Sequence, residues 1–318
     1  MSLKPEAKAL LEMFEAKGLP PIEQQPLEAA RHGFETSCKL LSKAEKRART
    51  EDRRIQGFKG DIGIRIYTPE GNESTESPAL VYFHGGGWVI GSIETHDALC
   101  HKLATEGNFT LVSVDYSLSP ESKFPVAVED AYLAVQWVWE HASEFGINRK
   151  SIAVGGDSAG GNLAAVVCYL AIQRKTPFIA YQMLFYPSTG FEATSSYEKY
   201  GEGYYLTKST MSWFVEQYLN DPSETQNPLA APILIPDDIT PSLPPAYIMT
   251  AEYDPLCDGG EQYAKKLEKA GVDTKYTCVP GMIHGFLCMT EFLADGKEAI
   301  KQAANEFRAR VSNRVHST

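Results

Sequence analysis

A Gly-x-Ser-x-Gly sequence joins a short apolar run to a longer apolar segment, and this junction constrains the fold more than any other stretch. The pattern is Gly156-Asp157-Ser158-Ala159-Gly160; it follows the strand-like residues 151–154 and precedes the helix-like residues 162–170. A serine on such a tight strand-to-helix turn is exposed by a strained backbone, and the flanking glycines let strand and helix approach closely. The pattern indicates a nucleophile elbow at Ser158. Alone it also fits an ordinary glycine-rich turn, so the interpretation needs partners elsewhere in the chain.

Strand-like and helix-like segments alternate through most of the chain after residue 78. Apolar strands that alternate with helices of about a dozen residues are typical of βαβ units. The sequence therefore predicts the α/β class, a mostly parallel twisted sheet with helices on both faces, preceded by a half-exposed strand around Ile62–Ile66. The predicted strands lie at 79–84, 110–115, 152–154, 180–186, 245–251 and 273–279, and the helices at 95–106, 126–144, from 159, at 259–270 and at about 296–311.

Two regions do not follow this alternation of strands and helices. Their sequences indicate a cap on a single catalytic domain. Residues 1–50 contain two amphipathic helices, at 5–19 and from Leu27, before any strong strand signal. Residues 187–241 show no clear strand and are rich in Tyr, Gly, Thr and Ser. Long irregular insertions are usually either functional or disordered, and the aromatic content of this one favours a lid. We expect a catalytic domain over 51–318, with 187–241 as a cap insertion; ordinary packing of the N-terminal helices on the core fits their spacing equally well.

The charge balance excludes several classes of partner. The 318 residues carry a net charge of −11, which argues against nucleic acid and anionic lipid surfaces, where a basic patch is expected. The basic segment Lys43–Arg54 is interrupted by acidic residues, so we expect a solvated connection there. The N-terminus lacks the apolar core of a signal peptide, and the longest apolar run, Leu163–Ile172, is too short to span a bilayer. We expect a cytoplasmic protein with no membrane partner.

The cysteine spacing indicates neither a zinc site nor a disulfide framework, because no C-x-x-C pair occurs. We expect free thiols, mostly buried, and we expect no metal and no organic cofactor. The six cysteines are Cys38, Cys100, Cys168, Cys257, Cys278 and Cys288.

A nucleophilic serine requires a base, and the base requires an orienting carboxylate. In an α/β sheet such groups lie in loops at the carboxyl ends of strands. Of the seven histidines only His84 and His284 follow predicted strands, and His284 follows the last one, where the chain order Ser…Asp…His places the base. Asp254 directly follows the preceding strand and is the predicted acid. Its rival Asp258 lies closer to a helix start, where an N-cap is the better interpretation.

Three consecutive glycines follow the first parallel strand, in His84-Gly85-Gly86-Gly87-Trp88. Backbone N–H groups without side chains in the way are suited to binding a tetrahedral oxyanion. We expect Gly86 and Gly87, together with Ala159 beside the nucleophile, to form the oxyanion hole, while His84 supports the loop. Neither glycine-rich phosphate-binding pattern occurs, which disfavours a phosphate loop.

Aromatic residues near these motifs predict an apolar pocket, although ordinary core packing explains any one of them equally well. Asp157, beside the nucleophile, is expected to be structural. The predicted pocket residues are Trp88, Tyr204, Tyr205, Trp213 and Phe214.

Taken together, the motifs resemble the hormone-sensitive-lipase-like group of bacterial carboxylesterases, in the α/β-hydrolase fold, and are most similar to its acetyl esterases. The resemblance implies that Ser158 is the nucleophile, Asp254 the acid and His284 the base, under a cap that covers an acyl pocket. It rests on residues 84–88, 115–121 with Phe124-Pro125, 156–162, 254–256 and 284–286.

The chain departs from that group at two places. Ser117 and Ser119 replace the common Arg and Ala, and Cys257-Asp258-Gly259 replaces the more usual Arg-Asp-Glu. Both changes are expected to affect packing or surface pairing, so the assignment of the three catalytic residues stands.

The resemblance predicts a carboxylesterase that hydrolyses short-chain acyl esters through an acyl-enzyme, with a small ester and water as its partners and a homodimer left open. An amidase, formamidase or lactonase would use the same groups, because one scaffold serves several acyl donors. A non-catalytic small-molecule receptor is the alternative from another class. Receptors that resemble this group lack the histidine, whereas His284 is present here.

Overall fold

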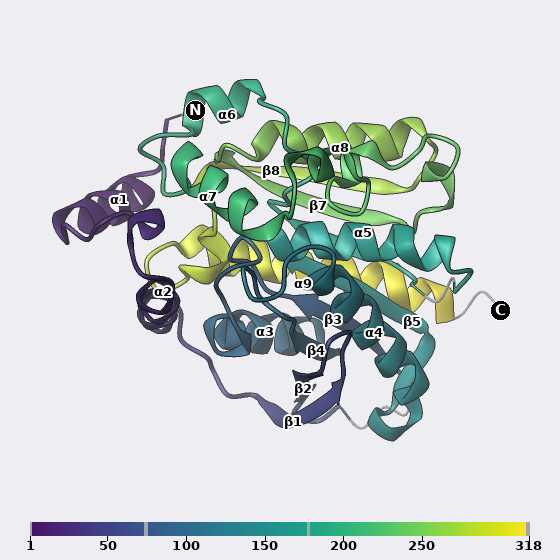
Figure 1. The fold of residues 1–318 in the computed structure, drawn as a ribbon. Coiled ribbons are helices and arrows are strands. Elements are labelled where there is room, and N and C mark those ends of the chain that lie inside the picture. Colours follow the sequence, from purple (N-terminus) through teal and green to yellow (C-terminus); the bar gives the residue numbers. More distant parts are fainter. Residues whose placement is uncertain (1, 73–75, 177–178, 316–318) are drawn as a thin grey trace.

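The computed structural model describes residues 2–72, 76–176 and 179–315. Its strands form one eight-stranded sheet in the order β1-β2-β4-β3-β5-β6-β7-β8 (Figure 1). β2 is antiparallel to both of its neighbours, and all pairs from β4 to β8 are parallel, which confirms the predicted α/β class. The strands are β1 (Ala48–Gln56), β2 (Asp61–Pro69), β3 (Ser77–Phe83), β4 (Thr110–Asp115), β5 (Ile147–Asp157), β6 (Gln182–Phe185), β7 (Ala246–Tyr253) and β8 (Thr274–Ile283).

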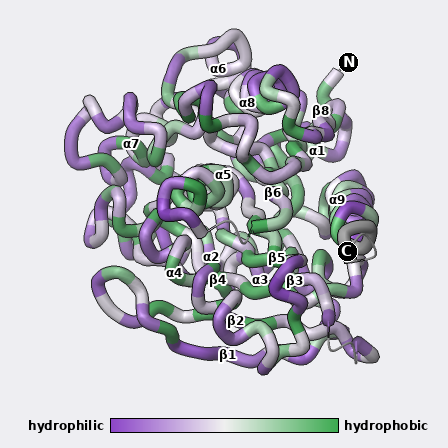
Figure 2. The backbone as a smooth tube through the Cα atoms, turned by 90° about the vertical axis from the view of Figure 1, so that its right-hand side faces the viewer, coloured by the Kyte–Doolittle hydropathy of each residue, from purple (hydrophilic) through white to green (hydrophobic). Residues whose placement is uncertain are grey.

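Helices cover both faces of the sheet, as the alternation predicted. Figure 2 shows α4 and α9 on opposite sides of the central strands. Each face has its own buried apolar cluster, and successive residues of β3 alternate between them: Val81 belongs to one cluster, and Leu80 and Tyr82 to the other. On one face lie α3 (Ile93–Gly107) and α9 (Ala294–Val315); on the other lie α4 (Val126–Glu140), α5 (Ala159–Gln173) and α8 (Cys257–Lys269).

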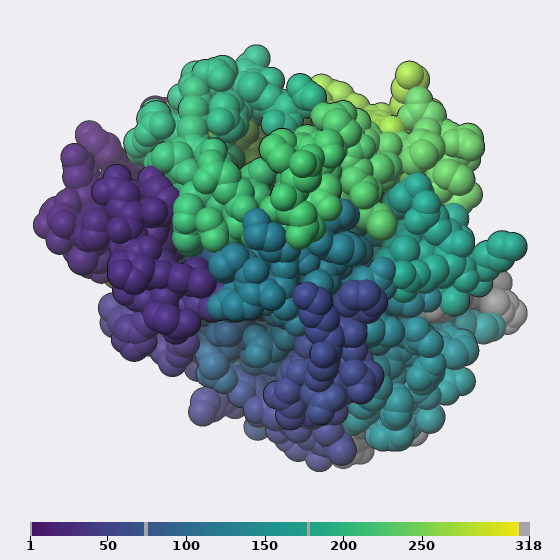
Figure 3. Space-filling view, in the orientation of Figure 1, coloured from purple at the N-terminus to yellow at the C-terminus, as the bar shows by residue number. Residues whose placement is uncertain are grey.

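The N-terminal helices and the 187–241 insertion lie together beside the sheet. In Figure 3 the purple N-terminal residues border the green residues of the insertion on one face of the molecule. The N-terminal elements are α1 (Pro5–Ala16), η1 (Ile22–Gln24) and α2 (Leu27–Leu41), and those of the insertion are α6 (Ser195–Tyr200), α7 (Lys208–Tyr218), η3 (Pro222–Gln226), η4 (Pro232–Leu234) and η5 (Thr240–Ser242). Two further short turns of helix are η2 (Ala142–Phe145) and η6 (Phe286–Cys288).

The expectation of a solvated connection over Lys43–Arg54 is wrong for most of that segment. β1 begins at Ala48 and pairs with the whole of β2, from Ala48 opposite Pro69 to Gln56 opposite Asp61. β1 carries no apolar alternation because it is an edge strand whose middle residues face solvent, and charged side chains on an edge oppose pairing with other chains. The expected boundary at residue 51 therefore falls inside a strand.

The carboxyl ends of β3, β5, β7 and β8 lie along one edge of the sheet, since these strands are mutually parallel. β8 continues to Ile283, four residues beyond the predicted strand end at 279, so His284 follows a strand directly instead of lying in a longer loop. Across the described part of the chain, no helix has the length and apolar character needed to cross a bilayer.

Candidate active site

The turn between β5 and α5 holds Ser158 in a strained backbone conformation. Ser158 has φ 55° and ψ −117°, and it stands between the last residue of β5 and the first of α5. Conformations of this kind cost of order 1–3 kcal/mol and persist only where the surroundings enforce them. A side chain at Gly160 would overlap the carbonyl of Phe83, and one at Gly156 would overlap Gly160. The two glycines therefore allow the close approach that keeps the serine on the turn.

His284 links Ser158 to Asp254 through both nitrogens of its ring. Nε2 lies 3.0 Å from Ser158 Oγ, and Nδ1 lies 2.7 Å from Asp254 Oδ2. A carboxylate only accepts, so Nδ1 carries the proton and Nε2 is left to accept from the serine hydroxyl. Asp254 is fully buried, and its second oxygen accepts the N–H of Leu256 at 2.8 Å. This is the arrangement in which a histidine can take a proton from a serine.

Asp258, the rival carboxylate, lies outside this chain of hydrogen bonds. Its Oδ2 accepts the backbone N–H of Ser196 at 2.8 Å, in the first turn of α6. The expectation that it caps its own helix is wrong, because Leu256 is the N-cap residue of α8 and the Asp258 carboxylate accepts its hydrogen bond from a different helix. Asp258 instead satisfies an N–H group at the start of a neighbouring helix.

The loop after β3 brings two glycine N–H groups to the same pocket as Ser158. Gly86 and Gly87 have φ 119° and 58°. Among the described residues, neither backbone N–H donates a hydrogen bond, whereas the Gly86 carbonyl accepts from Val89 at 3.1 Å and from Ile90 at 2.9 Å. Both glycines line the pocket with Ser158 and with Ala159, the first residue of α5. The predicted oxyanion-hole residues therefore share one cavity with the serine.

Buried hydrogen bonds hold the glycine loop after β3 in place. Asp157 accepts from the Tyr82 hydroxyl at 2.7 Å and from the Gly85 N–H at 2.9 Å, and His96 Nε2 lies 3.3 Å from its other oxygen. Asp157 thus joins the serine turn to the glycine loop, as expected of a structural residue.

His84 also holds the loop and is not placed for proton transfer. Its Nδ1 donates to the Gly85 carbonyl at 2.8 Å, and its ring stacks on Tyr116 at 4.3 Å. Burial, followed by the nearby His96, lowers the pKa of His84 to about 3, so the ring is neutral at any physiological pH.

One group of potential metal ligands lies near the serine, formed by His96, Asp157 and Cys288 within 4.8 Å of one another. Asp157 already accepts hydrogen bonds from Tyr82 and Gly85 and lies 3.3 Å from His96 Nε2, and burial raises the pKa of the Cys288 thiol well above its usual value. A cation would have to displace these bonds and deprotonate the thiol, so the group is better described as a hydrogen-bond network.

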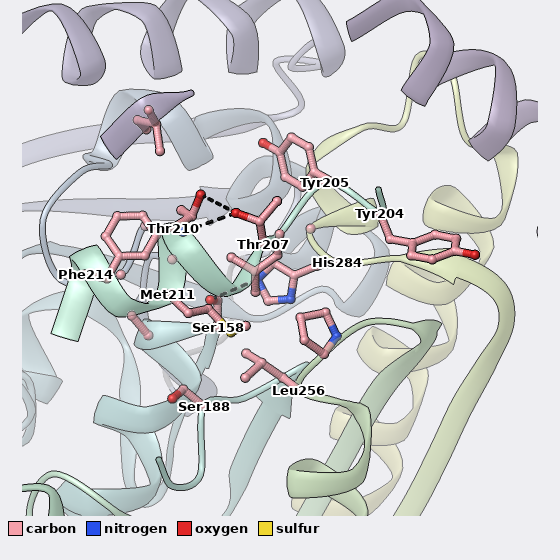
Figure 4. A pocket seen from close by; sticks show the side chains of 18 of the residues that line it. Ser158, Ser188, Tyr204, Tyr205, Thr207, Thr210, Met211, Phe214, Leu256 and His284 are labelled. Atoms are coloured by element: carbon pink, nitrogen blue, oxygen red, sulfur yellow. Dashed lines mark hydrogen bonds between the residues drawn. The ribbon is translucent and has the colours of Figure 1, made fainter. Parts of the chain in front are cut away.

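The serine opens into a cavity of about 1310 Å³ between the sheet edge, the N-terminal helices and the insertion. Figure 4 shows Ser158 and His284 in the middle of the lining residues, with Tyr205 above them and Tyr204 to one side, both from the insertion. Trp88 also lines it, buried and stacked on Tyr218 at 4.3 Å.

Among the described residues, the predicted pocket residue Trp213 does not line the cavity, whereas Phe214 does. Neighbouring residues of α7 face different sides of the helix, so only one of these two side chains can point into the cavity. The Trp213 ring lies beside that of Phe214, with centroids 5.3 Å apart. Sequence reasoning also missed Met211, Leu256 and Phe14 as lining residues. Met211 and Phe14 lie on helix faces whose apolar spacing was visible, but spacing does not say which surface such a face covers.

Contacts between the N-terminal elements and the site explain how the cavity is covered. Thr210 in α7 donates to Glu23 in η1 at 3.0 Å, which joins the insertion to the N-terminal segment. Arg31 in α2 donates to the Val89 carbonyl at 2.9 Å, just after the glycine loop, and also binds Glu121. The N-terminal helices therefore contact both the insertion and the loop that contains the glycines.

Comparisons with known proteins match this chain to the α/β-hydrolase fold and to ester hydrolases. A family model described as alpha/beta hydrolase fold matches residues 80–288. The chain is 40% identical over 291 residues to the carboxylic ester hydrolase LipN of Mycobacterium tuberculosis, covering 89% of this chain and 76% of LipN. It is 35% identical over 309 residues to an ethyl acetate hydrolase of Pseudomonas putida, covering 94% and 96%. The structure of ester-hydrolase EH1AB1, from the metagenome of Lake Arreo, superposes with a TM-score of 0.94 at 37% identity, covering 98% and 99%.

Replacing Gly86 with alanine should disable the glycine loop. A Cβ there would overlap the Ile90 carbonyl, and φ 119° is strained for alanine, so the loop must shift. We expect Gly86→Ala to lower kcat on p-nitrophenyl acetate by about 10²-fold or more, the effect of losing an oxyanion donor.

The matched control is Gly271→Ala, which also has positive φ, 81°, but has nothing within 4 Å of the added Cβ. It should lose about 1 kcal/mol of stability in urea unfolding and keep its turnover. A Gly86→Ala enzyme with near wild-type kcat would contradict the role given to this loop.

Proposed function

The chain belongs to the hormone-sensitive-lipase-like group of the α/β-hydrolase family, and on this basis we propose that it is a serine carboxylesterase that hydrolyses short-chain acyl esters. The membership agrees with the resemblance read from the sequence motifs. The observation that carries the proposal is the pair of contacts made by one ring, His284 to Ser158 at 3.0 Å and His284 to Asp254 at 2.7 Å. The named relatives and the solved structure are ester hydrolases, which supports an ester substrate.

The reaction proceeds through an acyl-enzyme. Ser158 Oγ attacks the ester carbonyl while His284 Nε2 accepts its proton, and Asp254 stabilises the imidazolium that forms. The N–H groups of Gly86, Gly87 and Ala159 bind the oxyanion, and helix α5 adds the positive end of its dipole. His284 then protonates the leaving alcohol, and water repeats the sequence on the acyl-enzyme.

The N-terminal helices α1 and α2 and residues 187–241 form the cap over the acyl pocket in this proposal, and Trp88, Tyr204 and Tyr205 bind the substrate. The contacts of Thr210 with Glu23, and the cavity that both regions line, support this role. A cytoplasmic location and a homodimeric assembly stay proposals from the sequence.

A series of p-nitrophenyl esters tests the activity and its chain-length preference. We expect kcat/KM to be highest for acetate or butyrate and to fall at least tenfold by dodecanoate, as a pocket suited to small groups discriminates by about that amount. Ser158→Ala should lower kcat by about 10³-fold or more while the melting temperature stays close to wild type. The matched p-nitroanilide is the amide control. Faster turnover of the anilide than of the ester, or a fully active Ser158→Ala enzyme, would contradict the proposal.

A pair of carboxylate variants tests the assignment of the acid. Asp254→Asn should lower kcat by about 10⁴-fold, because an amide no longer holds the tautomer with Nδ1 protonated. Asp258→Asn should leave kcat near wild type, since that side chain binds Ser196 and not the histidine. Kinetics of both purified variants on p-nitrophenyl acetate decide the matter, and a larger loss in Asp258→Asn than in Asp254→Asn would reverse the assignment.

A further inference from the structure

Two thiols lie side by side where α8 begins next to β8. Cys257 is the first residue of α8, and Cys278 lies in β8 opposite Thr250 of β7. Their sulfur atoms are 3.8 Å apart, and Cys257 Sγ also lies 3.6 Å from Thr250 Oγ1. A disulfide bond is about 2.0 Å long, so its formation requires the sulfurs to approach by only about 1.8 Å.

Differences in exposure and pKa among the cysteines indicate which thiol of this pair reacts first with an oxidant. Cys38, Cys100 and Cys168 are buried, and burial raises the pKa of each, that of Cys38 to about 12. Cys278 is exposed, and the hydrogen bond from Cys257 lowers its pKa to about 7. The thiolate is the reactive form of cysteine. Cys278 is therefore the sulfur that an oxidant in solution meets as a thiolate, with a second thiol already in contact.

We propose that Cys257 and Cys278 form a peroxide-sensitive dithiol that closes reversibly into a disulfide between α8 and β8. The Cys278 thiolate attacks one oxygen of hydrogen peroxide, so that an S–O bond forms, the O–O bond breaks and hydroxide leaves, giving a sulfenic acid. The Cys257 thiol then attacks the Cys278 sulfur; the S–S bond forms, the S–O bond breaks, and the thiol proton leaves with the hydroxyl as water. The two sulfurs lose two electrons in total, and the peroxide gains them.

The two cysteines lie close in sequence to the proposed catalytic residues Asp254 and His284. Cys257 donates its backbone N–H to the carbonyl of Asp254 at 3.1 Å, and Cys278 lies on the strand that ends immediately before His284. The bond would close a loop between residues 21 positions apart and join the two segments that carry the proposed acid and base. The dithiol itself needs only the two sulfurs, so it does not rest on the proposed function.

Mass spectrometry of peroxide-treated protein tests the proposal. Reduced full-length protein is exposed to hydrogen peroxide, and remaining thiols are alkylated. We expect an intact mass lower by about 2 Da before alkylation, the loss of two free thiols and full reversal by dithiothreitol. Cys278 and Cys288 lie in one tryptic peptide, Tyr276–Lys297, so the Cys288→Ser variant serves to assign the cross-link to Cys278.

Two single variants separate the steps. Cys257→Ser should form no cross-link and should instead accumulate a sulfenic acid at Cys278 that dimedone traps, whereas Cys168→Ser, at a buried thiol in α5, should form the cross-link like wild type. Wild-type protein whose Cys257 and Cys278 both stay alkylatable after peroxide, or that links other cysteines, would overturn the proposal. Independent oxidation of the two sulfurs to sulfinic acids would overturn it equally.

Discussion

The close approach of β5 to α5 at Ser158 is the constraint on which the rest of the site depends. The positive φ of this serine is tolerated because Gly156 and Gly160 let the two elements meet, and because α5 is buried along almost its whole length against the sheet. The same turn contains Asp157, whose carboxylate accepts the Gly85 N–H at 2.9 Å. One turn therefore positions both the attacking oxygen and the loop that is proposed to bind the oxyanion.

The parallel sheet brings the other residues of the site to the same place. β3, β5, β7 and β8 are parallel, so the residues that follow them come together at one edge although they are far apart in sequence. Asp254 shows what this edge provides: it is fully buried, yet both of its oxygens accept hydrogen bonds, from His284 and from Leu256. A buried carboxylate with both oxygens satisfied is held in one orientation, and that orientation fixes the tautomer of the histidine.

The sequence was informative wherever local chemistry and strand order sufficed. The elbow, the glycine loop and the positions of Asp254 and His284 after strands are all visible without coordinates, because each depends on a turn or a strand end. β1 was missed because an exposed edge strand carries no apolar alternation. The expectation that Asp258 caps its own helix was wrong because its carboxylate accepts the N–H of Ser196, which belongs to a different helix. Trp213 was misplaced because its direction depends on how α7 packs, which spacing along one helix does not determine.

Covalent labelling by diethyl p-nitrophenyl phosphate tests Ser158 as the nucleophile most directly, because this reagent phosphorylates an activated serine rapidly and stoichiometrically. We expect release of one p-nitrophenolate per chain, complete loss of esterase activity and a single diethyl phosphate adduct, on Ser158. We expect no adduct in Asp254→Asn over the same time. Inactivation with the label on any other residue, or full activity after Ser158 is labelled, would show that Ser158 is not the nucleophile.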